Sequence, residues 1–305
     1  MTSTPRSSPH RLSYARARSA SGTAILAALL LLPGVTPLAS VSAQNPPPGD
    51  NRTVVPRDTA HAERRQTLFT YRDAILAGAF ASLTVLMFPL DENVARQIRQ
   101  DSTFNGLTQK SAVGFETIAA PGAYVIGGSL YIFGRLARRP DLTDFAWHGT
   151  EAVLLANGIT GILKGTLGRS RPFVSADTNP RDFRFGGGFG SSDRQSFPSG
   201  HTTTAFAAAA AVTSEIRRLH PKALPYVATV MYGGATLVGL SRMYHNKHWA
   251  SDVVLGAAVG TFSGLKVVRY SHAHRDNKID RIMLHAVIAP DGQGGGYLGL
   301  ALPAP

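Results

Sequence analysis

The sequence predicts an all-α protein, a bundle of about six core helices followed by a short C-terminal β-hairpin. Six apolar segments, each roughly 14 to 17 residues long and rich in Ala, Gly, Leu and Val, alternate with polar stretches, a pattern that favours helices over strands. The segments span residues 74–90, 118–133, 150–163, 202–216, 226–240 and 253–268. Charged residues are only 16% of the chain, below the roughly 25% typical of soluble domains, which predicts broad buried surfaces or lipid contact.

The N-terminal segment 1–43 has the pattern of an export signal. Four arginines precede an apolar run at 24–32, and Val41-Ser42-Ala43 matches the small-residue pattern of a cleavage site. The run is too short to favour a spanning helix. Because the segment contains four arginines and no acidic residue, its removal lowers the formal net charge from +12 to +8 (12 − 4). We therefore expect an exported protein of the periplasm or cell envelope, either integral to a membrane or associated with one.

The rest of the chain divides into three parts. Residues 44–66 are rich in Pro and polar residues and show no apolar period, so they are expected to be a flexible linker. The helical bundle is predicted at 67–270, and residues 271–305 form a C-terminal extension. In this extension, apolar runs at 282–289 and 296–302 flank a Gly-rich turn and predict the hairpin.

Composition excludes several classes of function. The chain has no cysteine, so disulfides, thiol chemistry and Fe–S clusters are excluded. Its basic balance suits anionic substrates or an anionic membrane surface. No nucleic-acid partner is expected, because the chain lacks the lysine-rich runs and the alternation of aromatic and basic residues that such binders use.

Two opposing observations bear on membrane insertion. Each apolar segment is shorter than the roughly 20 residues that span a bilayer comfortably. Gly127-Gly128 and Gly233-Gly234, however, suit close helix packing in lipid or in a core. If residue 44 starts outside and every segment crosses, the three arginines that follow the second segment contradict the positive-inside rule. A spanning bundle and a soluble or peripheral exported bundle both remain hypotheses.

The stretch Ser241–Asp252 carries an arginine, two histidines and an aspartate at the junction between the fifth and sixth predicted helices. His248 and Asp252 are four residues apart, which places them on one helix face. A carboxylate there can accept a hydrogen bond from one ring nitrogen, fixing the tautomer and leaving the other nitrogen as a nucleophile or base. Arg242 offers forked donors suited to a phosphate. The alternative is an Asp at a helix start that neutralises a neighbouring His.

Two more stretches place polar residues at helix ends. Lys164–Pro172 closes the third predicted helix, and Pro198–His201 opens the fourth. Antiparallel packing of consecutive helices brings the ends of the third and fifth beside the starts of the fourth and sixth, so all three stretches are expected to meet on one face. The charged, Gly-rich loop at 173–197 joins two of these helices and is expected to border the site. Plain helix capping and dipole pairing are the alternatives for each stretch alone.

The residue types in these stretches suit phosphate chemistry. Lys164, Arg171 and Arg242 would surround a tetrahedral anion and stabilise its charge. Ser199 and Gly200, at a helix N-terminus, would add a hydroxyl and backbone N–H donors.

The same stretches supply groups for acid–base and nucleophilic steps. By hypothesis His248 attacks phosphorus, Asp252 orients it, and His201 protonates the leaving oxygen. His245 suggests a metal site, but no carboxylate or cysteine set completes one, so no metal is expected. Arg169 is expected to be structural or peripheral. The other histidines lack partners in sequence and are expected to be surface or core residues: His148, His220, His272, His274 and His285.

The three stretches resemble, in order and at every signature position, the three-part signature of the type 2 phosphatidic acid phosphatase and vanadium haloperoxidase superfamily. The matching residues are Lys164, Arg171 and Pro172, then Pro198, Ser199, Gly200 and His201, then Ser241, Arg242, His248 and Asp252. The residues around the motifs look more like the lipid phosphatase branch. By helix count, the resemblance covers most of 74–268.

The resemblance implies a helical bundle that hydrolyses a phosphomonoester or pyrophosphate without a metal, through a phosphohistidine. It also implies the residue roles given above, and no cofactor, although vanadate could bind as a phosphate mimic. The substrate it implies is a phosphorylated lipid, such as phosphatidic acid or undecaprenyl pyrophosphate. The alternatives are a secreted non-specific acid phosphatase acting on small organic phosphates and, ranked lower, a vanadate-dependent haloperoxidase. A catalytically idle envelope-binding protein is disfavoured by the intact His201, His248 and Asp252.

Overall fold

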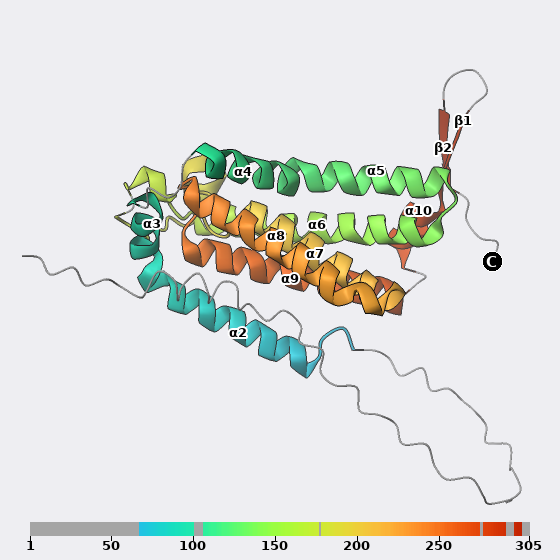
Figure 1. The fold of residues 1–305 in the computed structure, drawn as a ribbon, viewed down its shortest axis with the longest axis horizontal. Coiled ribbons are helices and arrows are strands. Elements are labelled where there is room, and N and C mark those ends of the chain that lie inside the picture. Colours follow the sequence, from blue (N-terminus) through green and yellow to red (C-terminus); the bar gives the residue numbers. More distant parts are fainter. Residues whose placement is uncertain (1–66, 101–105, 177, 275–276, 291–295, 301–305) are drawn as a thin grey trace, which may run out of the picture. The chain divides into compact units, whose positions relative to one another are not determined.

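The chain is mostly helical wherever its structure is described, which confirms the predicted all-α class (Figure 1). The computed structural model describes residues 67–100, 106–176, 178–274, 277–290 and 296–300, and the predicted signal (1–43) and linker (44–66) lie outside them. The α-helices are α2 Tyr71–Met87, α3 Asp91–Gln100, α4 Gly106–Thr117, α5 Ala123–Leu136, α6 Pro140–Leu167, α7 Gly200–Leu219, α8 Leu224–Tyr244, α9 Ala250–Ala273 and α10 Lys278–His285. A π-helical segment, η2 Ile118–Gly122, joins α4 to α5. The short 3₁₀ turns are η1 Phe88–Leu90, η3 Pro172–Val174, η4 Gly187–Phe189, η5 Ser192–Arg194 and η6 Pro221–Ala223.

The helices extend well beyond the apolar segments that predicted them. α6 has 28 residues, α7 has 20, α8 has 21 and α9 has 24. α6 begins early because Pro140 occupies its first turn, where no backbone N–H is needed. It ends at Gly168, whose φ of 58° lies in the left-handed region that favours glycine. The short apolar segments therefore do not argue against spanning a bilayer, because polar residues lengthen these four helices at both ends.

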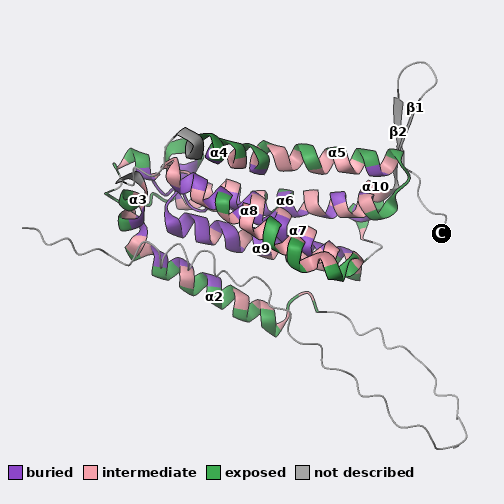
Figure 2. Ribbon diagram, in the orientation of Figure 1, coloured by how far each residue is buried: buried purple, intermediate pink, exposed green. Residues whose placement is uncertain are grey.

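In the part of the chain that the structure describes, four helical segments are long and apolar enough to cross a membrane. They are Tyr71–Ile98, Lys110–Leu136, Pro221–Tyr244 and Ala250–Ala273. Large apolar side chains on α2, α5 and α8 are exposed, among them Leu86, Phe133 and Val230, whereas α9 is mostly buried (Figure 2). Exposed apolar surface of this extent is unusual for a protein in water, and lipid would cover it. Length, composition and surface therefore fit a membrane-integral bundle.

Small residues allow α7 and α9 to approach closely at the centre of the bundle. A side chain at Gly256 would lie 2.6 Å from the backbone oxygen of Ser199, and one at Gly264 would lie 2.6 Å from that of Ala207. Gly260, one turn from each, leaves no room between α9 and the backbone of α7. Small residues at every fourth position let two helix backbones pack tightly. This contact fixes the start of α7 against the start of α9.

The four glycines for which the sequence predicts close helix packing differ in how near another helix lies. A side chain at Gly127 on α5 would clash with the hydroxyl of Thr150 on α6, so this glycine does permit close packing. At Gly128, Gly233 and Gly234, a side-chain methyl would meet no described atom within 4 Å, so these glycines do not mediate helix contacts. The prediction of close packing is therefore right for one glycine of the four.

The C-terminal part begins with α10, which packs against α6. The indole nitrogen of Trp147 on α6 donates a 3.0 Å hydrogen bond to Asp280 on α10. Two five-residue segments follow with antiparallel strand geometry, β1 Ala286–Pro290 and β2 Gly296–Leu300. Their side chains and the turn between them lie outside the described residues, so the C-terminal hairpin stays a prediction.

Candidate functional site

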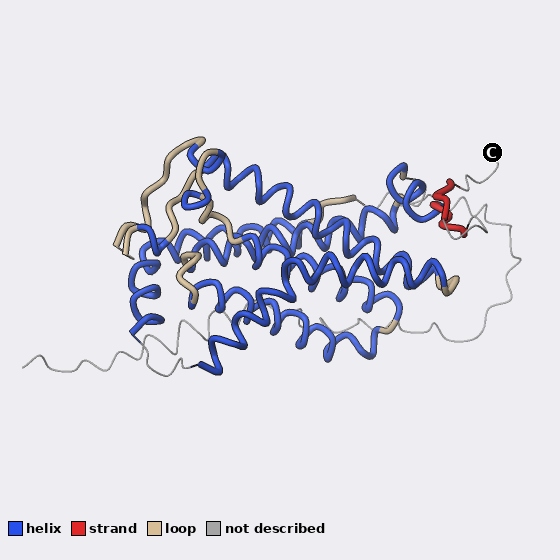
Figure 3. The backbone as a smooth tube through the Cα atoms, turned by 90° about the horizontal axis from the view of Figure 1, so that it is seen from above, coloured by secondary structure: helices blue, strands red, loops and turns tan. Residues whose placement is uncertain are grey.

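Loops and helix ends from distant parts of the sequence gather at one end of the bundle (Figure 3). The segment after α6, the start of α7, the end of α8 and the start of α9 all lie there. The backbone N–H of Ser199 donates a 2.9 Å hydrogen bond to the carbonyl of Asp252, which ties the start of α7 to that of α9. The side chain of Lys164 lies next to Gly200. The structure thus brings the three sequence stretches together.

A buried ion network lies behind this site. The guanidinium of Arg169 is fully buried and contacts Asp91 at 2.7 Å and Asp252 at 2.5 Å. It lies among aromatic rings, with its central carbon 4.9 Å from the centre of Phe88 and 5.5 Å from that of Trp249. Buried charges persist only when they are paired and hydrogen-bonded, as they are here. The sequence predicts that Arg169 is structural or peripheral. In the structure its role is structural, and it lies at the centre of the ion network.

The carboxylate of Asp252 accepts hydrogen bonds from several residues around it. Besides Arg169, its carboxylate accepts from the hydroxyl of Ser196 at 2.5 Å and from the backbone N–H of Trp249 at 2.8 Å. The last bond caps the first turn of α9. The carboxylate is therefore held rigidly at the helix start, which fixes the segment that carries His248.

The tautomer of His248 is set by a backbone group. Its Nδ1 lies 2.7 Å from the carbonyl oxygen of Ser196 and 3.5 Å from Oδ2 of Asp252. A carbonyl can only accept, so Nδ1 carries the proton and, in the neutral ring, Nε2 keeps its lone pair. Nδ1 of His248 donates to this carbonyl in place of the expected direct bond to Asp252, because Asp252 already accepts from Arg169 and Ser196.

Burial keeps the His248 ring neutral. It lowers the pKa of His248 to about 3, and the nearby positive charges of Lys164 and Arg171 act in the same direction. These two effects outweigh the opposing effect of Asp252. At neutral pH the side chain is therefore an imidazole with an unprotonated Nε2.

Two of the predicted phosphate-binding cations flank this histidine. Lys164 donates to the backbone carbonyl of Gln195, and Nε of Arg171 donates to that of Ser192 at 2.9 Å. Burial, together with the charge of Arg171, lowers the pKa of Lys164 to about 7. Both cations are held by carbonyls of the predicted site-bordering loop rather than by carboxylates, so their charge stays available to an anion.

The third cation has an acidic partner that sequence analysis missed. Nη1 of Arg242 lies 2.5 Å from Glu116 on α4, and the other oxygen of Glu116 lies 2.6 Å from Nδ1 of His245. Nε of Arg242 is buried and finds no hydrogen-bond partner among the described residues. Glu116 thus holds one side of the guanidinium and leaves a donor for another acceptor. No sequence signal links Glu116 to Arg242, because the two are 126 positions apart.

The start of α7 supplies the remaining candidate groups. Ser199 is buried, accepts a 2.9 Å hydrogen bond from the hydroxyl of Thr202, and makes no side-chain bond to cap its own helix. Its hydroxyl oxygen therefore accepts from a side chain and not from a backbone N–H of its own helix, contrary to the simple capping alternative. Gly200 begins the helix beside Lys164. Burial, with the charge of Arg242, lowers the pKa of His201 to about 4.

Comparison with known proteins finds a family that resembles part of the chain. Residues 145–276 match the family model described as PAP2 superfamily, which is 132 of the 305 residues. Over 69 residues the chain is 45% identical to the lipid A 1-phosphatase of Porphyromonas gingivalis, a match that covers 23% of this chain and 15% of that protein. The segment shared with this relative is therefore a small part of the relative's length.

Two solved structures also resemble the chain. LpxE of Aquifex aeolicus aligns with a TM-score of 0.43 and 24% identity, covering 59% of this chain and 96% of that one. A PAP2-type phosphatidylglycerolphosphate phosphatase of Bacillus subtilis aligns with a TM-score of 0.47 and 21% identity, covering 68% of this chain and 99% of that one. Similarity of this degree carries no conclusion about the site or its substrate.

The ion network predicts a large effect of removing Arg169. We expect Arg169→Gln to lower the free energy of unfolding by about 3–5 kcal/mol, because Asp91 and Asp252 would lose their shared buried cation. Denaturation of the purified protein in detergent measures this change. Arg194→Gln is the control: its 3.0 Å pair with Asp182 is partly exposed and should contribute less than about 1 kcal/mol. Equal losses in the two variants would contradict the structural role of Arg169.

Proposed function

We propose that this protein is a metal-independent phosphatase that cleaves a phosphomonoester or pyrophosphate through a phosphohistidine on His248. The observation that carries the proposal is the free Nε2 of a neutral, buried His248, whose Nδ1 bond to Ser196 fixes the tautomer. A neutral imidazole held in this way is a nucleophile that needs no separate base. The match of residues 145–276 to the PAP2 superfamily model and the phosphatase name of the curated relative support the same reaction class.

The first step forms a covalent intermediate. Nε2 of His248 attacks phosphorus in line while the bond from phosphorus to the leaving oxygen breaks, and His201 gives its proton to that oxygen. Lys164, Arg171 and Arg242 stabilise the charge on the remaining phosphoryl oxygens, and Ser199 with the N-terminus of α7 adds uncharged donors.

The second step releases phosphate. Neutral His201 accepts a proton from water as the water oxygen attacks phosphorus, and the bond between phosphorus and Nε2 of His248 breaks. Inorganic phosphate leaves, and both histidines return to their starting protonation states. In the intermediate, the positive charge on the phosphorylated His248 ring is offset by Asp252, whose Oδ2 lies 3.5 Å from Nδ1.

We propose further that the substrate is a phosphorylated lipid and that the protein is integral to a membrane. An apolar cavity of about 320 Å³ lies between α4, α5, α6, α7 and α8. Phe115 lines it and directly precedes Glu116, the partner of Arg242, so one end of the cavity approaches the cations. An acyl chain matches its lining, which includes Leu130 and Val153. The exposed apolar faces of α2, α5 and α8 fit a bilayer better than a secreted soluble enzyme.

The nucleophile can be tested by chemical trapping. His248→Ala should lose turnover on every substrate while its unfolding curve stays close to that of the parent. Because phosphohistidine is labile in acid, rapid quenching into alkali followed by detection of labelled protein should reveal the intermediate in the parent and none in His248→Ala. Label retained by the variant would show that another residue is the nucleophile.

The pH dependence follows from the pKa of His201. As the general acid, His201 must be protonated, and in the free enzyme its pKa is about 4. We therefore expect kcat/KM to fall as pH rises above about 4, and to fall further as Lys164 loses its charge near its pKa of about 7. The kcat profile should extend to higher pH, because a bound phosphate anion raises the pKa of His201.

Leaving-group chemistry provides the control for this assignment. His201→Ala should lose much more activity on an alkyl phosphate than on p-nitrophenyl phosphate, whose leaving group needs little protonation, and its fall in kcat/KM above about pH 4 should be weaker. Equal losses on the two esters would contradict the acid role of His201.

The lipid substrate is tested by filling the cavity. Gly234 lines the cavity and has space for a side chain, so Gly234→Leu should raise KM for phosphatidic acid several-fold and leave p-nitrophenyl phosphate hydrolysis unchanged. Gly233→Leu is the matched control, because Gly233 also has open space but does not line the cavity. Phosphate release in detergent micelles measures both variants. An unchanged KM for the lipid in Gly234→Leu would contradict acyl-chain binding there.

A further inference from the structure

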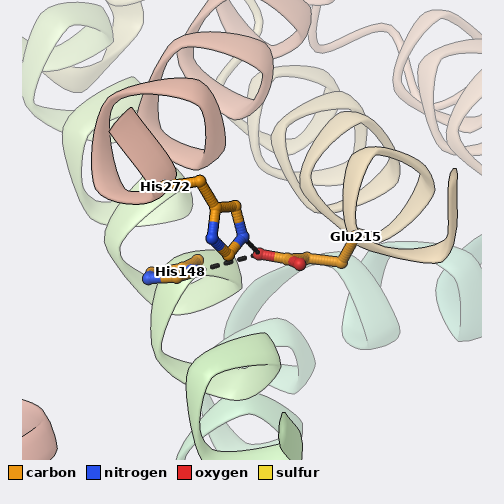
Figure 4. Close-up of side chains that lie close together, drawn as sticks. All are labelled: His148, Glu215 and His272. Atoms are coloured by element: carbon orange, nitrogen blue, oxygen red, sulfur yellow. Dashed lines mark hydrogen bonds and ion pairs between the residues drawn. The ribbon is translucent and has the colours of Figure 1, made fainter. Parts of the chain in front are cut away.

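A second cluster of titratable side chains lies far from the site just described. His148 on α6, Glu215 on α7 and His272 on α9 point toward one another (Figure 4). His148 precedes Lys164 by 16 positions on one helix, which corresponds to about 24 Å along the helix axis. These histidines have no partners nearby in the sequence, and α6, α7 and α9 bring together residues that are distant along the chain.

The three side chains have the composition and spacing of a metal site. Oε1 of Glu215 lies 2.8 Å from Nδ1 of His148 and 2.7 Å from Nε2 of His272. These three atoms all lie within 4.8 Å of one another. Zinc bonds to imidazole nitrogen and carboxylate oxygen are about 2.0–2.2 Å long, so ligand atoms around a tetrahedral ion are separated by roughly 3.3 Å. The two distances from Glu215 to the histidines would each have to lengthen by about half an ångström to accommodate the ion.

The outer nitrogen of His148 faces a carboxylate, as is common for histidines that bind a metal. The His148 side chain is only 3% exposed, and its Nε2 has no hydrogen-bond partner among the described residues. The nearest carboxylate oxygen, Oδ2 of Asp280, is 3.6 Å away. Histidines that bind a metal through one nitrogen commonly direct the other N–H to a carboxylate. If Nδ1 of His148 binds a metal, its Nε2 carries a proton, and this N–H points toward the carboxylate of Asp280.

The charges around the cluster also favour a cation. Glu215 and Asp280 are buried, Asp144 and Glu151 lie close enough to interact electrostatically with His148, and Arg218 is the cation that contacts Glu215, at 3.3 Å. Among the described residues, these four carboxylates lie around two imidazoles and one guanidinium in a poorly hydrated place. With the imidazoles neutral, the carboxylates would attract a divalent cation. Arg218 would hold the second oxygen of Glu215, away from the ion.

We propose that Nδ1 of His148, Nε2 of His272 and the carboxylate of Glu215 bind a Zn²⁺ ion, with Asp280 as a positioning residue for His148. Two imidazoles and one carboxylate are a ligand set that zinc favours over calcium or magnesium, which prefer oxygen ligands. His272 is 20% exposed and provides the entry path. The ion joins α6, α7 and α9 to one another and, through Asp280, to α10. Its role is structural and separate from the phosphate chemistry.

Zinc binding by the untagged full-length protein tests the proposal. After treatment with a chelator and removal of that chelator, the protein in detergent is titrated with Zn²⁺ against a chromophoric competitor. We expect one ion per chain and a rise in the thermal unfolding temperature. Asp280→Asn should weaken binding by about 10–100-fold, and His272→Ala at least as much. His274→Ala is the matched control: His274 is an exposed histidine two residues away whose ring contacts Tyr270, and its loss should leave the affinity unchanged.

Cobalt provides a readout that does not depend on stability. Co²⁺ bound by the parent and by His274→Ala should give the intense visible absorption of a tetrahedral site, and His272→Ala should not. Failure of the parent to bind Zn²⁺, or equal affinity in the parent and His272→Ala, would overturn the proposal and identify the cluster as an ion-pair network of protonated histidines. Because zinc binding is measured without substrate, the result is independent of phosphatase activity.

Discussion

The buried guanidinium of Arg169 is the constraint on which the functional end of the molecule depends. It contacts Asp91 at the start of α3 and Asp252 at the start of α9, and its own backbone follows the end of α6. A buried cation of this kind is stable only when its carboxylate partners hold fixed positions. Four aromatic rings around it exclude water. Helix ends that are far apart in sequence are therefore locked to one another by a single side chain.

From this network the geometry of the site follows in steps. Asp252, held by Arg169, accepts from Ser196 and from the backbone of Trp249, and the carbonyl of Ser196 then fixes the ring of His248. Asp252 thus positions His248 through Ser196, and its charge also acts on the His248 ring. Asp252 favours the charged form of the ring, but burial and the charges of Lys164 and Arg171 outweigh this effect, lower the pKa of His248 and keep the ring neutral.

The charged side chains at the two ends of the bundle are of opposite sign. At the end that holds His248, buried cations keep their charge available through contacts with backbone carbonyls, which suits a phosphate. At the far end, carboxylates outnumber cations around His148, which suits a divalent ion. Between the two ends, α7 and α9 pack closely against each other at Gly260, and this contact makes the centre of the bundle rigid. One set of helices can therefore support two separate sites.

The sequence by itself determined the helical class and the three stretches that converge, because apolar length and motif spacing are local properties. It also supplied the candidate roles of Lys164, Arg171, Arg242, His201 and His248. Only the tertiary structure decided which partners these residues have: Glu116 for Arg242, the Ser196 carbonyl for His248, and Arg169 for Asp252. It likewise joined His148 to His272 through Glu215. Such pairings link residues on different helices, and no local pattern of residues encodes how those helices pack.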